Sequence, residues 1–181
     1  MNTFAHIKPL FKLKKVAYYS VVIEGETHSL YEQFVKKHTV ENRKKLNHIQ
    51  TWLKIVGNKY GAQKHLFRNE AKGADTSALP PTGKHRKPTY VEHGKNKGNN
   101  LRLYTLRANE NVVFLFNGNI KTTDKAQDCP NVKTHFILAN QLTKAIDQAF
   151  RNKDIKWSED FTTIRYDKNF KLDINWNRKL K

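Results

Sequence analysis

A run of β-branched and aromatic residues from Val16 to Ile23, ending at Glu24 and Gly25, predicts the first β-strand of this chain. A short helix is predicted directly after it. Ser29 and Glu32 have the spacing of a capping box, in which the two side chains satisfy free backbone amides at the start of a helix. Its apolar face is predicted to consist of Leu30, Phe34 and Val35.

A second helix is predicted from about Thr39 to the glycines Gly57 and Gly61, because glycine readily takes the left-handed conformation that ends many helices. Apolar residues recur every three or four positions along it, as on one side of an α-helix. This stripe consists of Leu46, Ile49, Leu53, Val56 and Tyr60.

The segment from Arg68 to Asn100 changes in composition and is rich in Gly, Pro, Asn, Lys and Thr. Prolines and glycines interrupt it repeatedly, which predicts a long mobile loop. A basic loop of this kind either becomes ordered when it binds phosphates or is an idle solvated linker.

Three consecutive strands are predicted next, over Leu101–Arg107, Val112–Phe116 and Ile120–Asp124. Asn117 and Gly118 between the last two are the residue pair preferred in tight hairpin turns. The middle strand is apolar at every position, which predicts a central place in an antiparallel meander. A helix is predicted after Pro130, with its apolar stripe at Leu138, Leu142, Ala145, Ile146 and Ala149.

The predicted fold class is α+β. A small antiparallel sheet, made of the N-terminal strand and the three-stranded meander, has its helices packed on one side. A C-terminal hairpin is predicted from the alternation over Phe161–Tyr166 and Phe170–Trp176. The expected organisation is a basic segment over residues 1–15, a domain over 16–150 with a long basic loop at about 68–100, and an extension over 151–181.

The net charge of the chain indicates which classes of partner it is expected to bind. The chain of 181 residues has 34 Lys and Arg against 16 Asp and Glu, a formal net charge of +18. Such an excess attracts phosphate polymers by releasing their condensed counterions, which makes RNA the expected partner. A basic membrane-surface protein is a lesser possibility.

Cys129 is the single cysteine, which excludes an internal disulfide and a cysteine-based zinc site. No apolar run approaches the roughly 20 residues that span a bilayer, and the N-terminus does not have the pattern of a secretory signal. We therefore expect a cytoplasmic protein that is not inserted in a membrane.

One combination of motifs resembles the RelE/HigB toxin superfamily, and most closely its phage-derived HigB-like branch. The sequence LYTLR ends at Arg107, VVFLFNGNI follows from Val112, and Lys125, Pro130 and the last predicted helix come after it. The family has a strand ending in leucine-aromatic-glutamate-leucine-arginine, two further strands, a lysine-bearing segment, a proline and a closing helix. The similarity covers roughly residues 16–150.

The chain departs from the family pattern at two places. Thr105 stands where the family usually has glutamate, and Asn111 and Val112 occupy the region where an arginine is common. The resemblance implies a metal-independent RNA endonuclease, an mRNA interferase that acts at the ribosome and is neutralised by an acidic antitoxin. No cofactor and no metal are expected.

Metal-free RNA cleavage requires a base for the 2′-hydroxyl, cations for the developing negative charge and an acid for the leaving oxygen. Arg107 and Lys125 are the residues that the resemblance carries over, and His93 is one of several histidines that titrate near neutrality. The complete catalytic set that we consider is Arg107, Lys125, Arg102, Tyr104 and His93. The residues expected to bind RNA phosphates are Lys84, Arg86, Lys87, Lys95, Lys97 and Lys121.

Strand parity constrains this catalytic set. In a regular strand Arg102 and Tyr104 share one face, whereas Arg107 points to the other. A bulge near Thr105 would bring all three to one face, because one extra residue reverses every side chain after it.

Two other classes of function stay open at the level of sequence. A non-catalytic module would bind nucleic acid through stacked aromatics and lysines, and it would leave RNA intact. An interaction protein would use its charge to bind an acidic protein partner, with which RNA would not compete.

Overall fold

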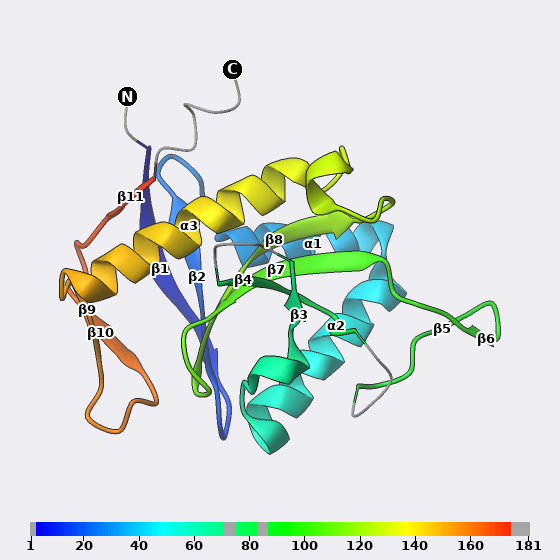
Figure 1. The fold of residues 1–181 in the computed structure, drawn as a ribbon, viewed down its shortest axis with the longest axis horizontal. Coiled ribbons are helices and arrows are strands. Elements are labelled where there is room, and N and C mark those ends of the chain that lie inside the picture. The colour runs from blue at the N-terminus through cyan, green and yellow to red at the C-terminus, as the bar shows by residue number, and fades with distance from the viewer. Residues whose placement is uncertain (1–2, 71–74, 83–86, 175–181) are drawn as a thin grey trace.

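The computed structural model describes residues 3–70, 75–82 and 87–174, and a seven-stranded sheet runs through it (Figure 1). The strand order is β11-β1-β2-β8-β7-β4-β3. β2 and β8 are parallel and the other neighbours are antiparallel, so the sheet is mixed and the predicted purely antiparallel sheet is wrong. The strands are β1 (Thr3–Lys12), β2 (Ala17–Ile23), β3 (Arg68–Asn69), β4 (Thr76–Leu79), β7 (Leu101–Arg107), β8 (Val112–Ile120) and β11 (Leu172–Ile174).

The predicted helices are present. α1 spans Leu30–Glu41, and the capping box of Ser29 and Glu32 is confirmed. α2 spans Arg43–Ile55 and continues into the π-helical turn η1 (Val56–Tyr60), after which Gly61 has a φ of +76°. α3 spans Lys133–Arg151, and short 3₁₀ turns form η2 (Lys64–Leu66) and η3 (Ala126–Asp128). Within the described residues, none of the helices combines the length and the apolar character needed to cross a bilayer.

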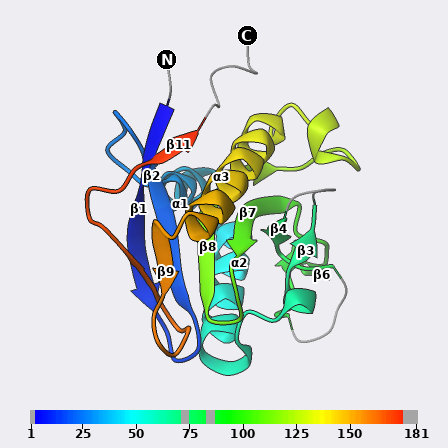
Figure 2. The same ribbon diagram turned by 60° about the vertical axis from the view of Figure 1, so that its left-hand side comes forward.

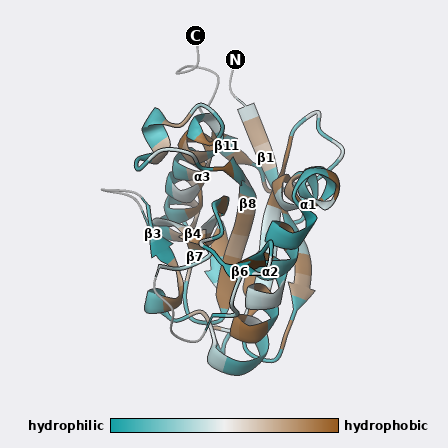
Figure 3. Cartoon of the chain, turned by 90° about the vertical axis from the view of Figure 1, so that its right-hand side faces the viewer, coloured by the Kyte–Doolittle hydropathy of each residue, from teal (hydrophilic) through white to brown (hydrophobic). Residues whose placement is uncertain are grey.

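Helices cover both faces of the sheet, which corrects the prediction that they pack on one side (Figures 1 and 2). Alternate residues of β8 point to opposite faces: Phe114 packs with the α3 residues and Leu115 packs with those of α1 and α2. Figure 3 shows β8 as an apolar strand between the helices. A strand that is apolar at successive positions needs a cover on each face, and burying such side chains contributes about 1.5–3 kcal/mol each.

β8 also differs from the prediction at its end. It runs through Asn117–Asn119 without a turn, and the predicted third strand over Ile120–Asp124 does not form. The pairing with β7 shifts between Leu103 and Thr105, because β8 has an extra residue there. A Cβ on Gly118 would lie 1.7 Å from the Arg102 carbonyl oxygen, so glycine permits a close backbone approach at this bulge.

The region predicted as a loop over 68–100 contains ordered strands, which corrects that prediction for its described residues. β4 is buried and pairs with β7, and a small hairpin forms from β5 (Val91–Glu92) and β6 (Lys95–Asn96). His48 of α2 contacts the Pro88 carbonyl at 2.6 Å and the Asn99 side chain at 3.0 Å. These contacts hold the polar segment against α2, although its composition resembles that of a free loop.

Both ends of the chain add strands to this body. The segment predicted as a basic N-terminus contains β1, which pairs with β2. The predicted C-terminal hairpin is wrong in its partners: β10 (Ile164–Tyr166) pairs with β9 (Ile155–Trp157), whereas β11 pairs with β1 at the sheet edge. Asp167–Asn169 therefore connects two different sheets. The last two positions of the predicted second strand of that hairpin, 175 and 176, lie outside the described residues.

Gly118→Ala should destabilise the protein by about 3 kcal/mol, because the new Cβ would force β7 and β8 apart at the bulge. Urea unfolding followed by circular dichroism measures the change in the free energy of unfolding. Gly98→Ala is the matched control, because a Cβ at Gly98 would meet nothing within 4 Å. Equal midpoints for the two variants would contradict the proposed role of Gly118.

Candidate functional site

An open pocket of about 840 Å³ lies where the second half of α3 faces η2, β4 and the end of β7. Four residues of α3 line it at helical spacing, from Lys144 to Arg151, so they share one side of the helix. Phe67 adds an apolar wall. The charged residues of this lining are Lys64, Arg107, Lys144, Arg151, Asp75 and Asp147.

Two buried pairs of hydroxyl groups hold β4 in place at this pocket. Thr76 donates a hydrogen bond of 3.0 Å to Thr143 of α3, and the hydroxyls of Ser77 and Thr105 lie 2.8 Å apart. β4 is therefore tied to α3 on one face and to β7 on the other. These contacts fix the distance between the helix and the strands that form the pocket.

Arg107 is the cation best placed for a ligand in the pocket. It is the last residue of β7 and is half-buried. Among the described residues, its buried Nε has no hydrogen-bond partner. A guanidinium has five N–H donors in a planar fork that matches phosphate oxygens, so an arginine that lines the pocket and has an unused Nε favours an anionic ligand.

Asp75 and Asp147 place two carboxylates in the same pocket. Burial raises the pKa of Asp147, and the charge of Asp75 raises it further, whereas Arg151 lowers it. A carboxyl group with a raised pKa retains a proton more readily near neutral pH. Two carboxyl groups next to cations, with the pKa of Asp147 raised, can therefore accept and donate protons at a bound phosphate.

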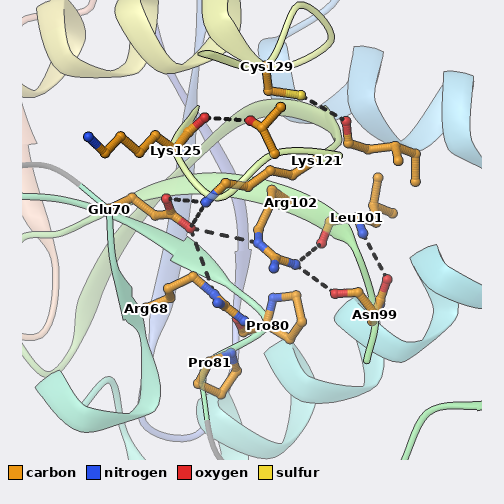
Figure 4. A network of polar contacts seen from close by, with 12 residues as sticks. Arg68, Glu70, Pro80, Pro81, Asn99, Leu101, Arg102, Lys121, Lys125 and Cys129 are labelled. Carbon is orange, nitrogen blue, oxygen red and sulfur yellow. Dashed lines mark hydrogen bonds and ion pairs between the residues drawn. The ribbon is translucent and has the colours of Figure 1, made fainter. Parts of the chain in front are cut away.

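A second charged group of residues lies on the α3 face of the sheet, and we name it the Glu70 cluster: Arg68, Glu70, Arg102 and Lys121 (Figure 4). Lys121 Nζ lies 3.0 Å from Glu70 Oε2, whereas the Nε atoms of Arg68 and Arg102 lie 3.8 and 3.7 Å from Oε1. The side chains of Glu70, Lys121 and Arg102 are only 6, 10 and 11% exposed.

The cations of this cluster affect one another. Burial lowers the pKa of Arg102 to about 10, with a further lowering by Arg68 that Glu70 only partly offsets. Burial also lowers the pKa of Lys87, and Arg68 and Arg102 add to that effect. The buried hydroxyl of Tyr104 lies next to this group, and burial followed by the charge of Glu70 raises its pKa.

The predicted catalytic residues are divided between these two places. Arg102 lies in the Glu70 cluster and Tyr104 lies beside it, on one face as strand parity predicts. The bulge lies in β8, opposite Tyr104, instead of in β7 near Thr105. β7 therefore keeps its alternation, and Arg107 lies separately in the pocket.

The other two catalytic candidates lie apart from the pocket lining. Lys125 precedes η3, and its carbonyl accepts a 2.7 Å hydrogen bond from Thr123, while its side chain is exposed. His93 lies at the turn of the β5–β6 hairpin with a φ of +51°. This hairpin projects from the body on the side away from the C-terminal end of α3 (Figure 1).

The predicted RNA-binding lysines also have different environments. Lys95 and Lys97 are exposed on or beside β6, whereas Lys121 belongs to the Glu70 cluster and has a side chain that is only 10% exposed. Lys87 donates a 3.0 Å hydrogen bond to the Pro81 carbonyl. Lys84 and Arg86 lie outside the described residues.

The sequence pattern does not reveal Arg68, Glu70 and Asp75 as site residues, because their segment has the composition of a loop. The prediction also omitted the polar side of α3, although a signal was present. Lys144, Asp147, Gln148 and Arg151 recur at three and four residues, opposite the apolar stripe. This stripe of positive and negative residues on the last helix is therefore the feature of the sequence that could have indicated the pocket.

Asp147→Asn should stabilise the folded protein by about 0.5 kcal/mol at pH 7. Because the folded state raises the pKa of Asp147, it binds the proton more tightly than the unfolded chain, and stability falls as pH rises above the ordinary carboxyl range. Near pH 3 both states bind the proton, so the variant should match the wild type. Urea unfolding at the two pH values measures the difference in the free energy of unfolding between the variant and the wild type. Asp124→Asn, at an exposed carboxylate, is the control, and an equal gain from it would contradict the assignment.

Comparison of the chain with known protein families, with characterised proteins and with solved structures gave no significant match. No relative therefore assigns a chemistry to the pocket or to the Glu70 cluster.

Proposed function

We propose that this protein is a metal-independent endoribonuclease of the RelE/HigB type, with the Arg107 pocket as its RNA site. One observation carries the proposal: the pocket gathers Arg107, with its unused Nε, three further cations and two carboxylates of different environment. A nucleotide fits a pocket of about 840 Å³. The cations match its phosphate, and the carboxylates supply proton transfer.

The proposed reaction is attack by a ribose 2′-hydroxyl on the adjacent phosphate. Asp75 accepts the 2′-proton while the new P–O bond forms, and Arg107 and Lys144 stabilise the negative charge that develops on the phosphate oxygens. Asp147, in its protonated form, donates a proton as the bond to the 5′-oxygen breaks. The products are a 2′,3′-cyclic phosphate and a free 5′-hydroxyl.

The order of elements supports the likeness to RelE/HigB proteins. A strand (β2), two helices (α1 and α2), the LYTLR strand (β7), the VVFLFNGNI strand (β8) and a closing helix (α3) follow one another in the order that the resemblance implies. The chain departs from that order at the second further strand, which does not form between β8 and α3. β1, the short strands β3 to β6, and β9, β10 and β11 are additions to it. We propose that an acidic antitoxin covers the basic surface around the pocket, since the chain has a net charge of +18.

Arg107→Ala should lower the cleavage rate of single-stranded RNA by about 100-fold, because it removes charge stabilisation at the phosphate. Purified protein is incubated with labelled RNA in EDTA, with and without translating ribosomes, and the cuts are mapped. Arg43→Ala, which removes an exposed arginine at the start of α2, is the matched control and should cleave normally. Cleavage that is equally fast in both variants, or that EDTA abolishes, would sink the proposal.

A second candidate is a non-catalytic module for single-stranded nucleic acid, and Phe161 is the observation that favours it. The residue is 57% exposed, its φ is +61°, and Asn109 donates a 2.9 Å hydrogen bond to its carbonyl. A bulky residue with positive φ is a strained conformation that clusters at functional sites. Trp157 lies 6.4 Å from the Phe161 ring and stacks on Phe150 at 4.7 Å.

Phe161→Ala should weaken binding of single-stranded RNA by about 10-fold, which corresponds to the loss of one stacked base. The measurement is fluorescence anisotropy at constant ionic strength with a labelled oligonucleotide. Val40→Ala is the control, because Val40 is also an exposed apolar residue. The effect should vanish with an abasic oligonucleotide. Weaker binding in this variant, with RNA left intact by the wild type, would favour the binding module over the nuclease.

A further inference from the structure

The single carboxylate of the Glu70 cluster does not satisfy the cations around it. Hydrogen bonds between an N–H⁺ group and a carboxylate are normally about 2.7–2.9 Å long. Lys121 approaches this distance, at 3.0 Å, but Arg68 and Arg102 remain at 3.8 and 3.7 Å. The carboxylate of Glu70 therefore does not reach hydrogen-bonding distance of the Nε atom of either arginine.

Two buried groups beside the carboxylate are left without hydrogen bonds. Over the described ranges, Arg102 Nε and the Tyr104 hydroxyl have no hydrogen-bond partner, although each is buried. An unsatisfied buried polar group costs roughly 1–3 kcal/mol. Both groups can donate to an anion with several oxygens.

Backbone carbonyls, and not Glu70 alone, hold these cations in position. Arg102 Nη1 donates to the Asn99 carbonyl at 2.6 Å, and Arg68 Nε donates to the Pro80 carbonyl at 3.1 Å. The Lys121 amide bonds the Asn100 carbonyl at 2.8 Å. The two guanidinium groups are thus held by backbone carbonyls as well as by the carboxylate, whereas the Lys121 ammonium is held by Glu70. Cations that are positioned in advance are what an anion-binding site requires.

The positive and negative charges of the Glu70 cluster are also unbalanced. Arg68, Arg102 and Lys121 contribute three positive charges against the one negative charge of Glu70, and Lys87 is close enough to be affected by both arginines. Buried charge without a counter-ion is costly, because the protein interior solvates it poorly. A ligand with more than one negative charge would relieve this cost.

We propose that Arg68, Arg102 and Lys121 form a binding site for a terminal or free phosphate group, and that Glu70 occupies this site in the unliganded protein. A phosphate monoester has up to two negative charges and three free oxygens in a tetrahedral arrangement, so it can reach all three cations and the Tyr104 hydroxyl together. Glu70 follows the last residue of β3 and must turn away for the phosphate to enter. The site is separate from the Arg107 pocket and does not depend on the proposed nuclease activity.

The proposal is tested by removing the negative charge of Glu70, which occupies the site in the unliganded protein. In Glu70→Gln, inorganic phosphate should bind at least about 10-fold more tightly than in the wild type, since the competing charged contacts with the cations are lost. Isothermal titration calorimetry and the phosphate-dependent rise of Tm measure this, with chloride used to keep ionic strength constant. Glu24→Gln removes the exposed partner of Lys171 and is the matched control. It should leave phosphate affinity unchanged.

A second variant separates binding from folding defects. Adding Arg102→Gln to Glu70→Gln should abolish the gained affinity, because one of the three cations is lost. If Glu70→Gln is destabilised, phosphate should restore its Tm to that of the wild type. Equal phosphate affinity in Glu70→Gln, Glu24→Gln and the wild type, or no recovery of Tm with phosphate, would overturn the proposal.

Two further arms identify the source of the phosphate. An oligonucleotide with a 5′-phosphate that binds Glu70→Gln more tightly than both its 5′-hydroxyl form and inorganic phosphate would assign the site to a nucleic-acid end. Equal binding by inorganic phosphate would assign it to a free anion. The same titrations with Arg107→Ala added to Glu70→Gln should retain phosphate binding, so a failure of the nuclease proposal is distinguishable from a failure of this one.

Discussion

The burial of β8 on both faces is the constraint on which the rest of this structure depends. Phe114 and Leu115 are neighbours in the chain, yet they pack into different cores, so the sheet needs helices on each face. α1 and α2 cover one face in the long connection that joins the parallel strands β2 and β8. α3 must cover the other face. The polar side of α3 is thereby placed over the sheet edge, where it forms the wall of the pocket.

The bulge in β8 has a comparable effect on the Glu70 cluster. The extra residue near Gly118 reverses the side chains that follow, so Ile120 packs with the α1 and α2 core and Lys121 turns to the α3 face. Arg102 is on that same face by strand parity. The irregularity, possible because glycine lets the Arg102 carbonyl approach, therefore brings Lys121 to the carboxylate that Arg102 already faces.

The Arg107 pocket and the Glu70 cluster differ in how accessible they are to solvent and ligands. The Arg107 pocket is open, and its four cations and two carboxylates line a space of about 840 Å³. The Glu70 cluster is nearly closed, with its own carboxylate among the cations. A chain with a large excess of positive charge thus uses its few acids selectively: Asp75 and Asp147 stand beside an open site, and Glu70 fills a buried one.

The sequence by itself determined the local elements: the capping box at Ser29, the stripe of α2, the apolar β8 and the parity that separates Arg102 from Arg107. These depend on residues within one turn or one strand, so they are visible in spacing. Tertiary structure alone decided that Asn117 and Gly118 continue β8 next to a bulge instead of forming a turn, because the same residues suit both and the pairing with β7 selects one. Tertiary structure also decided which residues form the Glu70 cluster. Arg68 and Glu70 lie in a polar segment that takes its conformation from pairing with β4 and from contacts with residues far along the chain.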